Sequence, residues 1–168
     1  MLPEIAYRLF QPGDETAFRE LNEAWIARYF RLEDQDYIQL GDPEGMILRP
    51  GGQIVMAVAG EERIGCCALI LAKEGVFELA KMAVSERYRG RGIGRGLIEY
   101  TVALAKLLGA HTLELASNSK LANAVHLYEA VGFRHMPLER VEPSPYARAN
   151  VFMELHLSPD EKSSGVEG

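Results

Sequence analysis

Apolar residues recur along the chain with two spacings, and these spacings predict its strands and helices. Short apolar runs bounded by glycine, proline or charged turns indicate strands, whereas apolar residues three or four positions apart indicate helices. The predicted strands cover residues 4–10, 53–59, 63–72, 76–84, 111–117, 133–138 and 151–157. The predicted helices cover residues 15–30, 32–40, 93–108 and 118–133.

The order of these elements predicts a mixed α/β (α+β) fold. The loops "GEER" and "KEG" join the second, third and fourth predicted strands, and both have the length of hairpin connections. Strands alternate with helices after residue 84, which favours a sheet covered by helices. Residues 1–157 show no internal repeat and are predicted to form one domain, and the polar residues 158–168 are predicted to form a flexible tail.

Composition and charge argue against several classes of protein. The chain of 168 residues has a net charge of −6, which argues against a nucleic-acid partner. Its first residues lack the pattern of a signal peptide, and no apolar run is long enough to span a membrane. Cys66 and Cys67 are adjacent in a predicted strand, so their side chains point to opposite faces and a disulfide between them is not expected. These features favour a cytoplasmic protein with reduced core thiols and no membrane partner.

The stretch "RYRGRGIGRGL", residues 87–97, gathers four arginines and four alternating glycines at the start of a predicted helix. Arginines oppose the positive end of a helix dipole, so they indicate that an anion binds the backbone N–H groups there. A flexible basic turn is the alternative. The dinucleotide fingerprint GxGxxG fails at Leu97, although Glu114 stands where a ribose-binding acid would. A nucleotide-dependent oxidoreductase is therefore a remote third interpretation.

Two polar residues interrupt apolar patterns and are candidates for chemistry. Glu78 lies in the strand "VFELAKMAV" and is predicted on one face with Ala80, Met82 and Val84. A carboxylate there is either exposed at the strand end or a buried general base with a raised pKa. Tyr128 falls on the apolar face of the last predicted helix, where a tyrosine is either a core residue or a proton donor.

The motif "RGRGIG" (residues 89–94), followed by "LYEAVGF" (residues 127–133), resembles the signature of the GNAT superfamily of N-acetyltransferases. The predicted order of elements is similar to that of the family from residue 4 to residue 157. The resemblance implies a mostly antiparallel central sheet of about seven strands with about four flanking helices. It also implies an enzyme that transfers an acetyl group from acetyl-CoA to a primary amine.

The resemblance implies that the motif holds the pyrophosphate of acetyl-CoA through backbone N–H groups and arginines. The residues assigned to this role are Arg89, Arg91, Gly92, Gly94 and Arg95. Val84 is expected to line the pantetheine arm of the cofactor. Many family members have an asparagine seven residues before the tyrosine, but this chain has Leu121 there. Asn118 or Asn123 is left to make that contact, and Asn123 is the preferred candidate.

The resemblance also assigns catalytic roles. Glu78 would be the general base that deprotonates the amine, and Tyr128 the general acid that protonates the leaving thiolate. The backbone N–H of Met82 would stabilise the oxyanion of the tetrahedral intermediate. The presence of both Glu78 and Tyr128 argues against the main alternative, a non-catalytic module that senses acyl-CoA.

For the acceptor, the resemblance points to the first two predicted helices and the loop before the last strand. These segments supply Tyr29, Phe30, Glu33 and Tyr146, and Arg148 is an alternative ligand for an acceptor carboxylate. A small-molecule amine and a peptide amine are both compatible with these residues, and a homodimer is compatible with the family. The four histidines form no cluster with metal-ligand spacing, so no metal is expected.

Overall fold

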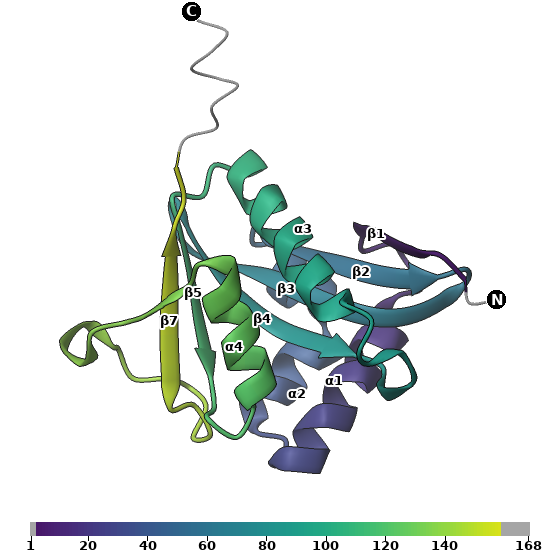
Figure 1. Cartoon of the computed structure of the whole chain (residues 1–168), viewed down its shortest axis with the longest axis horizontal. Coiled ribbons are helices and arrows are strands. Elements are labelled where there is room, and N and C mark those ends of the chain that lie inside the picture. Colours follow the sequence, from purple (N-terminus) through teal and green to yellow (C-terminus); the bar gives the residue numbers. More distant parts are fainter. Residues whose placement is uncertain (1–2, 159–168) are drawn as a thin grey trace, which may run out of the picture.

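Seven strands form one sheet in the order β1-β2-β3-β4-β5-β7-β6 (Figure 1). The computed structural model describes residues 3–158. The strands are β1 (Ile5–Leu9), β2 (Gln53–Ala59), β3 (Glu62–Lys73), β4 (Val76–Val84), β5 (Thr112–Ser117), β6 (Arg134–His135) and β7 (Val151–His156). The helices are α1 (Glu15–Tyr29), α2 (Asp34–Gly41), α3 (Ile93–Leu107) and α4 (Ala122–Val131), with shorter helical turns η1 (Glu44–Leu48), η2 (Glu86–Tyr88) and η3 (Leu138–Arg140).

All neighbouring strands in this sheet pair antiparallel except β4 and β5, which run parallel. That parallel pair is short, because it joins only Val76–Glu78 of β4 to residues 112–114 of β5. Beyond Glu78 the two strands diverge, as Figure 1 shows. The predicted fold class, a mostly antiparallel seven-stranded sheet with four flanking helices, is confirmed.

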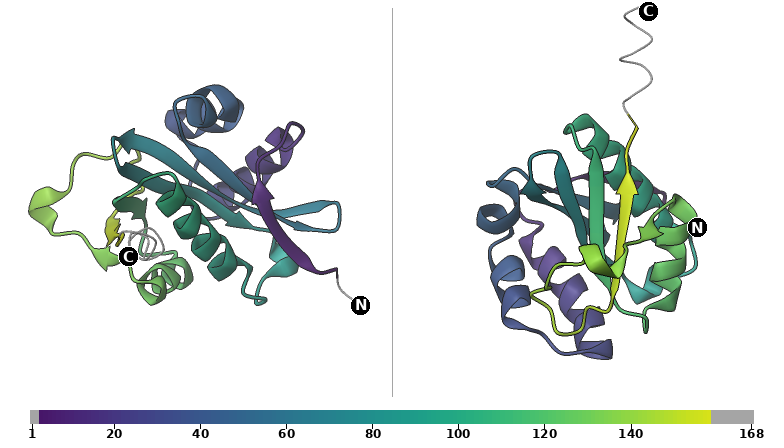
Figure 2. Two further views of the ribbon diagram at one scale, coloured as in Figure 1. Left: turned by 90° about the horizontal axis from the view of Figure 1, so that it is seen from above. Right: turned by 90° about the vertical axis from the view of Figure 1, so that its left-hand side faces the viewer.

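Helices cover both faces of the sheet and bury two separate cores (Figure 2). On one face, α1 and α2 bury residues such as Phe18, Ile26 and Leu40 against β2 and β3. On the other face, α3 and α4 cover a larger core that includes Leu97 and Tyr128. Cys66 packs in the first core and Cys67 in the second, and both are free thiols. Adjacent residues of a strand alternate between faces, so this placement confirms the expectation for the two cysteines.

A bulge at Lys81 changes the face on which the end of β4 packs. Lys81 has a φ of 53°, a left-handed conformation that is rare for residues other than glycine. Before the bulge, Glu78 and Ala80 stand opposite residues of β3 that belong to the α1 side of the sheet. After it, Met82 and Val84 pack against the core under α3 and α4. The prediction that Glu78 shares one face with Met82 and Val84 was therefore wrong, because strict alternation ignores a bulge.

Two other predicted boundaries were wrong for local reasons. The last predicted helix begins at residue 122, because the Asn118 side chain accepts the N–H of Lys120 at 2.8 Å and holds a turn there. The predicted strand 133–138 shrinks to Arg134–His135, since Pro137 has no N–H to extend the ladder. The predicted tail lies, from residue 159 on, outside the described residues. Over residues 3–158, none of the helices combines the length and apolar character needed to cross a bilayer.

Candidate active site

A cavity of about 620 Å³ opens where β4 and β5 diverge. Residues 78–84 of β4 form its floor, and the first turns of α3 and α4 form one side. The last turn of α1 and the loop at residues 146–149 form the other side. The divergence of two parallel strands therefore creates one space that both faces of the sheet can reach.

Two of the four alternating glycines shape the loop that enters α3. Gly90 and Gly92 have φ values of 78° and 76°, which favour glycine strongly. Gly92 is the N-cap of α3 and makes no side-chain cap hydrogen bond. The N–H groups of the first helical turn have no partner within the helix, and residues 92–95 of this turn line the cavity.

The other two glycines differ in how closely they pack. A Cβ on Gly94 would lie 3.7 Å from the Leu127 side chain of α4, which is ordinary contact. A Cβ on Gly96 would collide with the Tyr7 side chain of β1. Gly96 thus lets α3 approach β1, and Gly94 lies in the cavity wall between α3 and α4.

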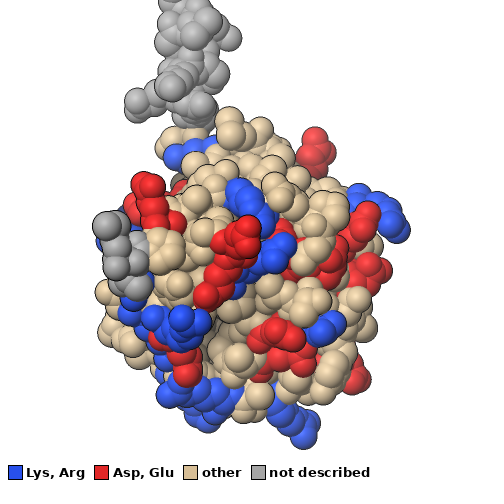
Figure 3. Space-filling view, turned by 90° about the vertical axis from the view of Figure 1, so that its right-hand side faces the viewer, with Lys and Arg blue, Asp and Glu red and all other residues tan. Residues whose placement is uncertain are grey.

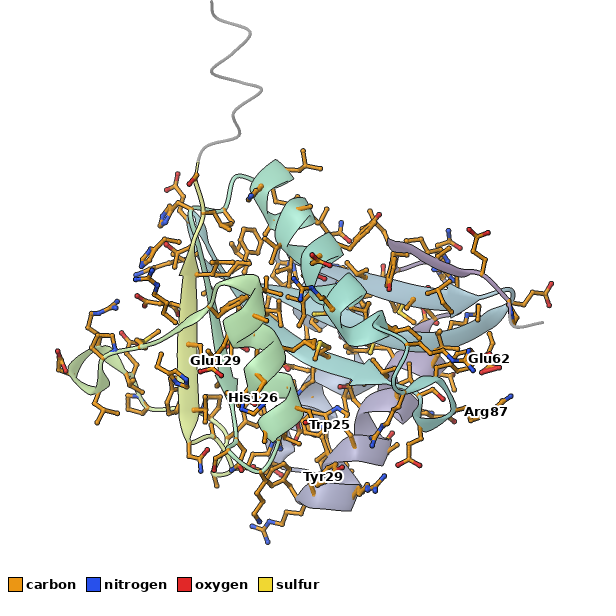
Figure 4. All side chains as sticks on the ribbon, in the orientation of Figure 1. Trp25, Tyr29, Glu62, Arg87, His126 and Glu129 are labelled. Atoms are coloured by element: carbon orange, nitrogen blue, oxygen red, sulfur yellow. The ribbon has the colours of Figure 1, made fainter. Side chains whose placement is uncertain are left out.

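The arginines of this stretch divide into two groups. Arg89 and Arg95 line the cavity, beside the open end of α3. Arg91 lies over the Tyr88 ring, with 4.9 Å between its guanidinium carbon and the ring centroid. Arg87 faces outward and pairs with Glu62 of β3 at 3.5 Å (Figure 4). The sequence analysis assigned Arg91 to the pyrophosphate, but Arg91 is not among the described residues that form the cavity wall.

Acidic side chains balance part of this positive charge on the surface. Arg95 approaches Glu99 at 3.7 Å and Arg89 approaches Glu86 at 3.9 Å. Figure 3 shows acidic side chains interspersed among basic ones on this side of the molecule, with basic ones gathered along its lower edge. The arginines therefore do not form an isolated positive surface. Arg89 and Arg95 differ from Arg87 and Arg91 because they border the cavity.

Glu78 lies at the point where the two strands part. Its last registered neighbour is Glu114 on β5, and it lines the floor of the cavity. Burial raises the pKa of the Glu78 carboxyl, the nearby cation Lys81 lowers it, and the carboxylate of Glu114 raises it further, with a net rise. No hydrogen bond reaches the Glu78 carboxyl from any residue between 3 and 158. A partly buried carboxyl with a raised pKa and no partner can accept a proton from a bound ligand.

Tyr128 reaches the same cavity from the opposite face of the sheet. Its ring packs edge-on against Phe133 with centroids 5.9 Å apart, in the core under α3 and α4. Burial raises the pKa of the Tyr128 phenol, and the nearby thiol of Cys67 adds to the rise. The phenol therefore stays protonated at neutral pH and can act as a donor. Met82 and Val84 line the space between Glu78 and the start of α3.

The two candidate asparagines occupy different positions. Asn118 is buried, and its side chain donates to the Arg148 carbonyl at 2.6 Å and accepts from Lys120. Asn123 is exposed in the first turn of α4 and lines the cavity. Asn118 also lines the cavity, but its side chain is engaged within its own turn and with Arg148, so Asn123 stays the preferred candidate for a ligand contact.

Three of the four residues expected around the acceptor line the cavity. Tyr29 and Phe30 come from the end of α1, and Tyr146 comes from the loop before β7. Trp25 lines the same wall and was missed in the sequence analysis, although it lies one helical turn before Tyr29 (Figure 4). Glu33 does not line the cavity among the described residues. It caps α2, where its side chain accepts the Ala147 N–H at 2.9 Å.

A buried ionic network that the sequence analysis missed lies beneath this wall. The ammonium of Lys81 donates to Asp36 at 2.6 Å and to the hydroxyl of Tyr146 at 2.9 Å. The guanidinium of Arg148 donates to both oxygens of Asp36, each at 2.7 Å. The Asp36 side chain is fully buried and that of Lys81 is 3% exposed. A lysine inside an otherwise apolar strand was the available signal for this network.

The charged groups of this network shift one another's pKa values. Burial alone would raise the pKa of Asp36, but the hydrogen bonds from Arg148 and Lys81 outweigh it and lower the pKa to about 2. Burial lowers the pKa of Lys81, and the contact with Asp36 opposes that change. The network links α2, β4 and the loop before β7, so it fixes that loop over one end of the cavity. Residues 3–158 contain no group of histidine, cysteine and acidic side chains that could hold a metal ion.

Comparison with known proteins places this geometry among acetyltransferases. The sequence model of the Acetyltransferase (GNAT) family matches residues 15–133. The uncharacterized N-acetyltransferase YvbK of Bacillus subtilis is 30% identical over 102 residues, which cover 59% of this chain and 66% of that protein. N-acetylaspartate synthetase of Rattus norvegicus is 31% identical over 107 residues, which cover 62% of this chain and 36% of that protein. The chain thus spans about two thirds of the first relative and about one third of the second.

Solved structures support the fold over nearly the whole chain. A GNAT-family acetyltransferase of Staphylococcus aureus superposes with a TM-score of 0.83 at 21% identity and covers 92% of this chain and all of its own. The putative acetyltransferase yncA of Salmonella typhimurium, solved with acetyl-CoA, superposes with a TM-score of 0.71 at 19% identity. That match covers 92% of this chain and 94% of the Salmonella protein.

Proposed function

Because the chain belongs to the GNAT family of acetyltransferases, we propose that it transfers an acetyl group from acetyl-CoA to a primary amine. One observation supports this proposal above the others. Glu78 and Tyr128 reach a single cavity from opposite faces of the sheet, and the open N-terminus of α3 borders the same cavity. A candidate proton acceptor, a candidate proton donor and a candidate anion site therefore border one space. We call the anion site, formed by residues 89–95 at the start of α3, the cradle.

The start of α3 fits the pyrophosphate of acetyl-CoA. The residues proposed to hold it are Arg89, Gly92, Gly94 and Arg95, through backbone N–H groups and two guanidinium groups. Gly92 adopts a φ of 76° and carries no side-chain cap, so its neighbourhood presents donors without competition. Val84 and Asn123 line the path between this cradle and Glu78 and are proposed to contact the pantetheine arm.

Acetyl transfer by direct attack requires three proton transfers: the nitrogen loses two protons and the leaving thiolate gains one. An alkyl ammonium with a pKa of about 10.4 must lose a proton before its nitrogen can attack, and Glu78 is proposed to accept that proton. The nitrogen bonds to the acetyl carbonyl carbon, the carbon–sulfur bond breaks, and coenzyme A leaves as a thiolate. Tyr128 is proposed to donate its proton to that sulfur. The nitrogen then loses its second proton to the Tyr128 phenolate, which leaves the neutral amide, and Glu78 releases its proton to solvent.

The end of β4 supplies the electrostatic part of this proposal. The bulge at Lys81 turns Met82 toward the α3 side of the sheet, where Met82 lines the cavity. A backbone N–H at this position would stabilise the negative charge that develops on the acetyl oxygen. The left-handed conformation of Lys81 costs free energy, and strain of this kind concentrates at functional sites.

Calorimetric titration of the purified chain with acetyl-CoA, followed by thiol release in the presence of amines, tests this function. We expect binding that is weakened in an Arg89→Ala/Arg95→Ala double variant, and turnover with at least one primary amine. Binding without turnover of any amine would support the non-catalytic acyl-CoA sensor instead. Lack of acetyl-CoA binding would overturn the proposed function.

A further inference from the structure

The end of the cavity next to Glu78 has an aromatic wall, which consists of Trp25, Tyr29, Phe30 and Tyr146. Trp25 and Phe30 meet edge-on with centroids 6.4 Å apart, and Tyr29 lies 6.5 Å from Phe30. Figure 4 shows Trp25 and Tyr29 along α1 near the first turn of α4. Rings packed against one another in this way offer a stable apolar surface to a ligand.

Three cations line this end of the cavity: Lys81, Arg148 and Lys120. Lys120 is exposed and lies over the Phe30 ring, 5.6 Å from its centroid. The other two are less exposed and already engaged. Arg148 forms a bidentate ion pair with Asp36. The guanidinium carbon of Arg148 lies 4.4 Å from the centroid of the Tyr146 ring and 5.7 Å from that of the Trp25 ring. Lys81 is enclosed between Asp36 and Tyr146. Both side chains line the cavity, but Asp36 already pairs with both positive charges, which disfavours the alternative role of Arg148 as a ligand for an acceptor carboxylate.

Glu78 is the acidic side chain that remains without a hydrogen bond at this end. Lys81 and Arg148 offset Asp36 and Glu33, whereas Glu78 receives no hydrogen bond within the described part of the chain. An ammonium group would supply the missing positive charge and the missing donor. A carboxylate on the carbon that bears the amine would instead meet Glu78 at short range, while the two less exposed cations nearby, Lys81 and Arg148, are already held by Asp36.

We propose that the acceptor is a primary amine with an aryl or branched alkyl group and with no carboxylate on the carbon that bears the nitrogen. This inference rests on the function proposed above. The ammonium pairs with Glu78, and the apolar group packs on the aromatic wall. Asp36 determines the specificity indirectly, because it keeps Lys81 and Arg148 from binding an acceptor carboxylate.

Matched substrates separate the charge of the acceptor from its size. With saturating acetyl-CoA, thiol release is measured for phenethylamine, phenylalanine amide and phenylalanine, and for isopentylamine and leucine. We expect kcat/KM for each amine, and for the amide, to exceed that of the matching amino acid by at least about 100-fold. An amino acid that reacts as well as its matching amine would overturn the inference, as would failure of every compound in the panel.

Two further measurements make the failure of this inference distinguishable from failure of the proposed function. If the panel fails but spermidine or a lysine peptide is acetylated, the proposed acetyltransferase function is supported and the inferred acceptor class is wrong. The Asp36→Asn variant provides a readout that partial unfolding does not affect, because it compares two substrates on one preparation. We expect its ratio of phenethylamine to phenylalanine kcat/KM to fall at least about tenfold, since Arg148 and Lys81 become available to a carboxylate.

An unchanged ratio in folded Asp36→Asn would contradict the role of Asp36. If that variant does not fold, Arg148→Met tests the same point. It removes one of the two cations that Asp36 is proposed to keep from an acceptor carboxylate. Its ratio should equal or exceed that of the unmodified protein, and a lower ratio would contradict the inference.

Discussion

Glu78 and Glu114 stand side by side as the last registered pair of β4 and β5, immediately before the two strands diverge. The proposed general base thus has a second carboxylate as its neighbour across the sheet. The negative charge of Glu114 at short range disfavours ionisation of Glu78, and this contributes to the raised pKa of Glu78. The sheet topology itself therefore helps to set the proton affinity of the proposed base.

The first prediction concerns this pair. Replacing Glu114 by Gln removes a negative charge beside Glu78, so the pKa of Glu78 should fall. Since Glu78 is active as the carboxylate, the acidic limb of the kcat/KM profile should move to lower pH. A pH–rate profile of the variant checks this. Glu129→Gln is the control, because Glu129 is an exposed carboxylate on α4 that pairs with His135, and its profile should match the unmodified protein. A shift in both variants, or in neither, would contradict the prediction.

The second prediction separates the arginines of the glycine-rich stretch. Arg89→Ala/Arg95→Ala should weaken acetyl-CoA binding by about tenfold or more, because each arginine borders the cavity and a charged hydrogen bond contributes about 1.5–3 kcal/mol. Arg91→Ala should change the Kd by less than about twofold, since Arg91 stacks on Tyr88 outside the wall. Calorimetry measures both. A larger loss of acetyl-CoA affinity in Arg91→Ala would indicate that Arg91 also contacts the pyrophosphate.

The third prediction concerns the backbone of Gly92. An alanine there would have to adopt a φ of 76°, which costs about 1–2 kcal/mol. The variant should lose about that much free energy of unfolding, and it should also bind acetyl-CoA more weakly because the cradle shifts. Gly41→Ala is the matched control, because a Cβ there meets nothing within 4 Å and requires no positive φ. Urea unfolding and calorimetry test both variants, and equal losses would exclude a special role for Gly92.

The fourth prediction concerns acid stability. The folded pKa of Asp36 is about 2, below the ordinary value of 3.8, so its ion pairs stabilise the fold fully above pH 4. That contribution should disappear as the pH falls from about 4 to 2. Asp36→Asn should lower the free energy of unfolding at neutral pH by about 3–5 kcal/mol, because Lys81 and Arg148 stay buried without their partner. The exposed Asp34 of the same helix supplies the control, and Asp34→Asn should retain the acid transition.

Much of the fold follows from sequence patterns whose causes are local. The helix at residues 93–108 was predicted to within one residue, because its apolar spacing is regular and Gly109 follows it. The strands at 53–59 and 76–84 were predicted with their observed bounds. The alternating pattern fails at Lys81. This residue has a left-handed conformation, so the side chains that follow it lie on the opposite face of the sheet from the one that alternation predicts.

Residue patterns alone point to the candidate site where residues stand out from their surroundings, and the family resemblance points to most of the other lining residues. Glu78 and Tyr128 are polar groups within apolar patterns, and both line the cavity. The contact between Asp36 and Arg148 joins residues 112 positions apart, and no local pattern encodes such a pair. The occupation of Arg148 by Asp36 was therefore visible only in the structure.

The most direct test of the proposed mechanism is the Glu78→Gln variant, measured for both acetyl-CoA affinity and turnover of an accepted amine. Gln has nearly the same shape but cannot accept the proton, so the Kd for acetyl-CoA should stay within about twofold while kcat falls by about 100-fold or more. The variant should also resist heat better, because burial of the ionised carboxyl is no longer required. Turnover by Glu78→Gln at the rate of the unmodified protein, with binding intact, would contradict the account of Glu78 as the base.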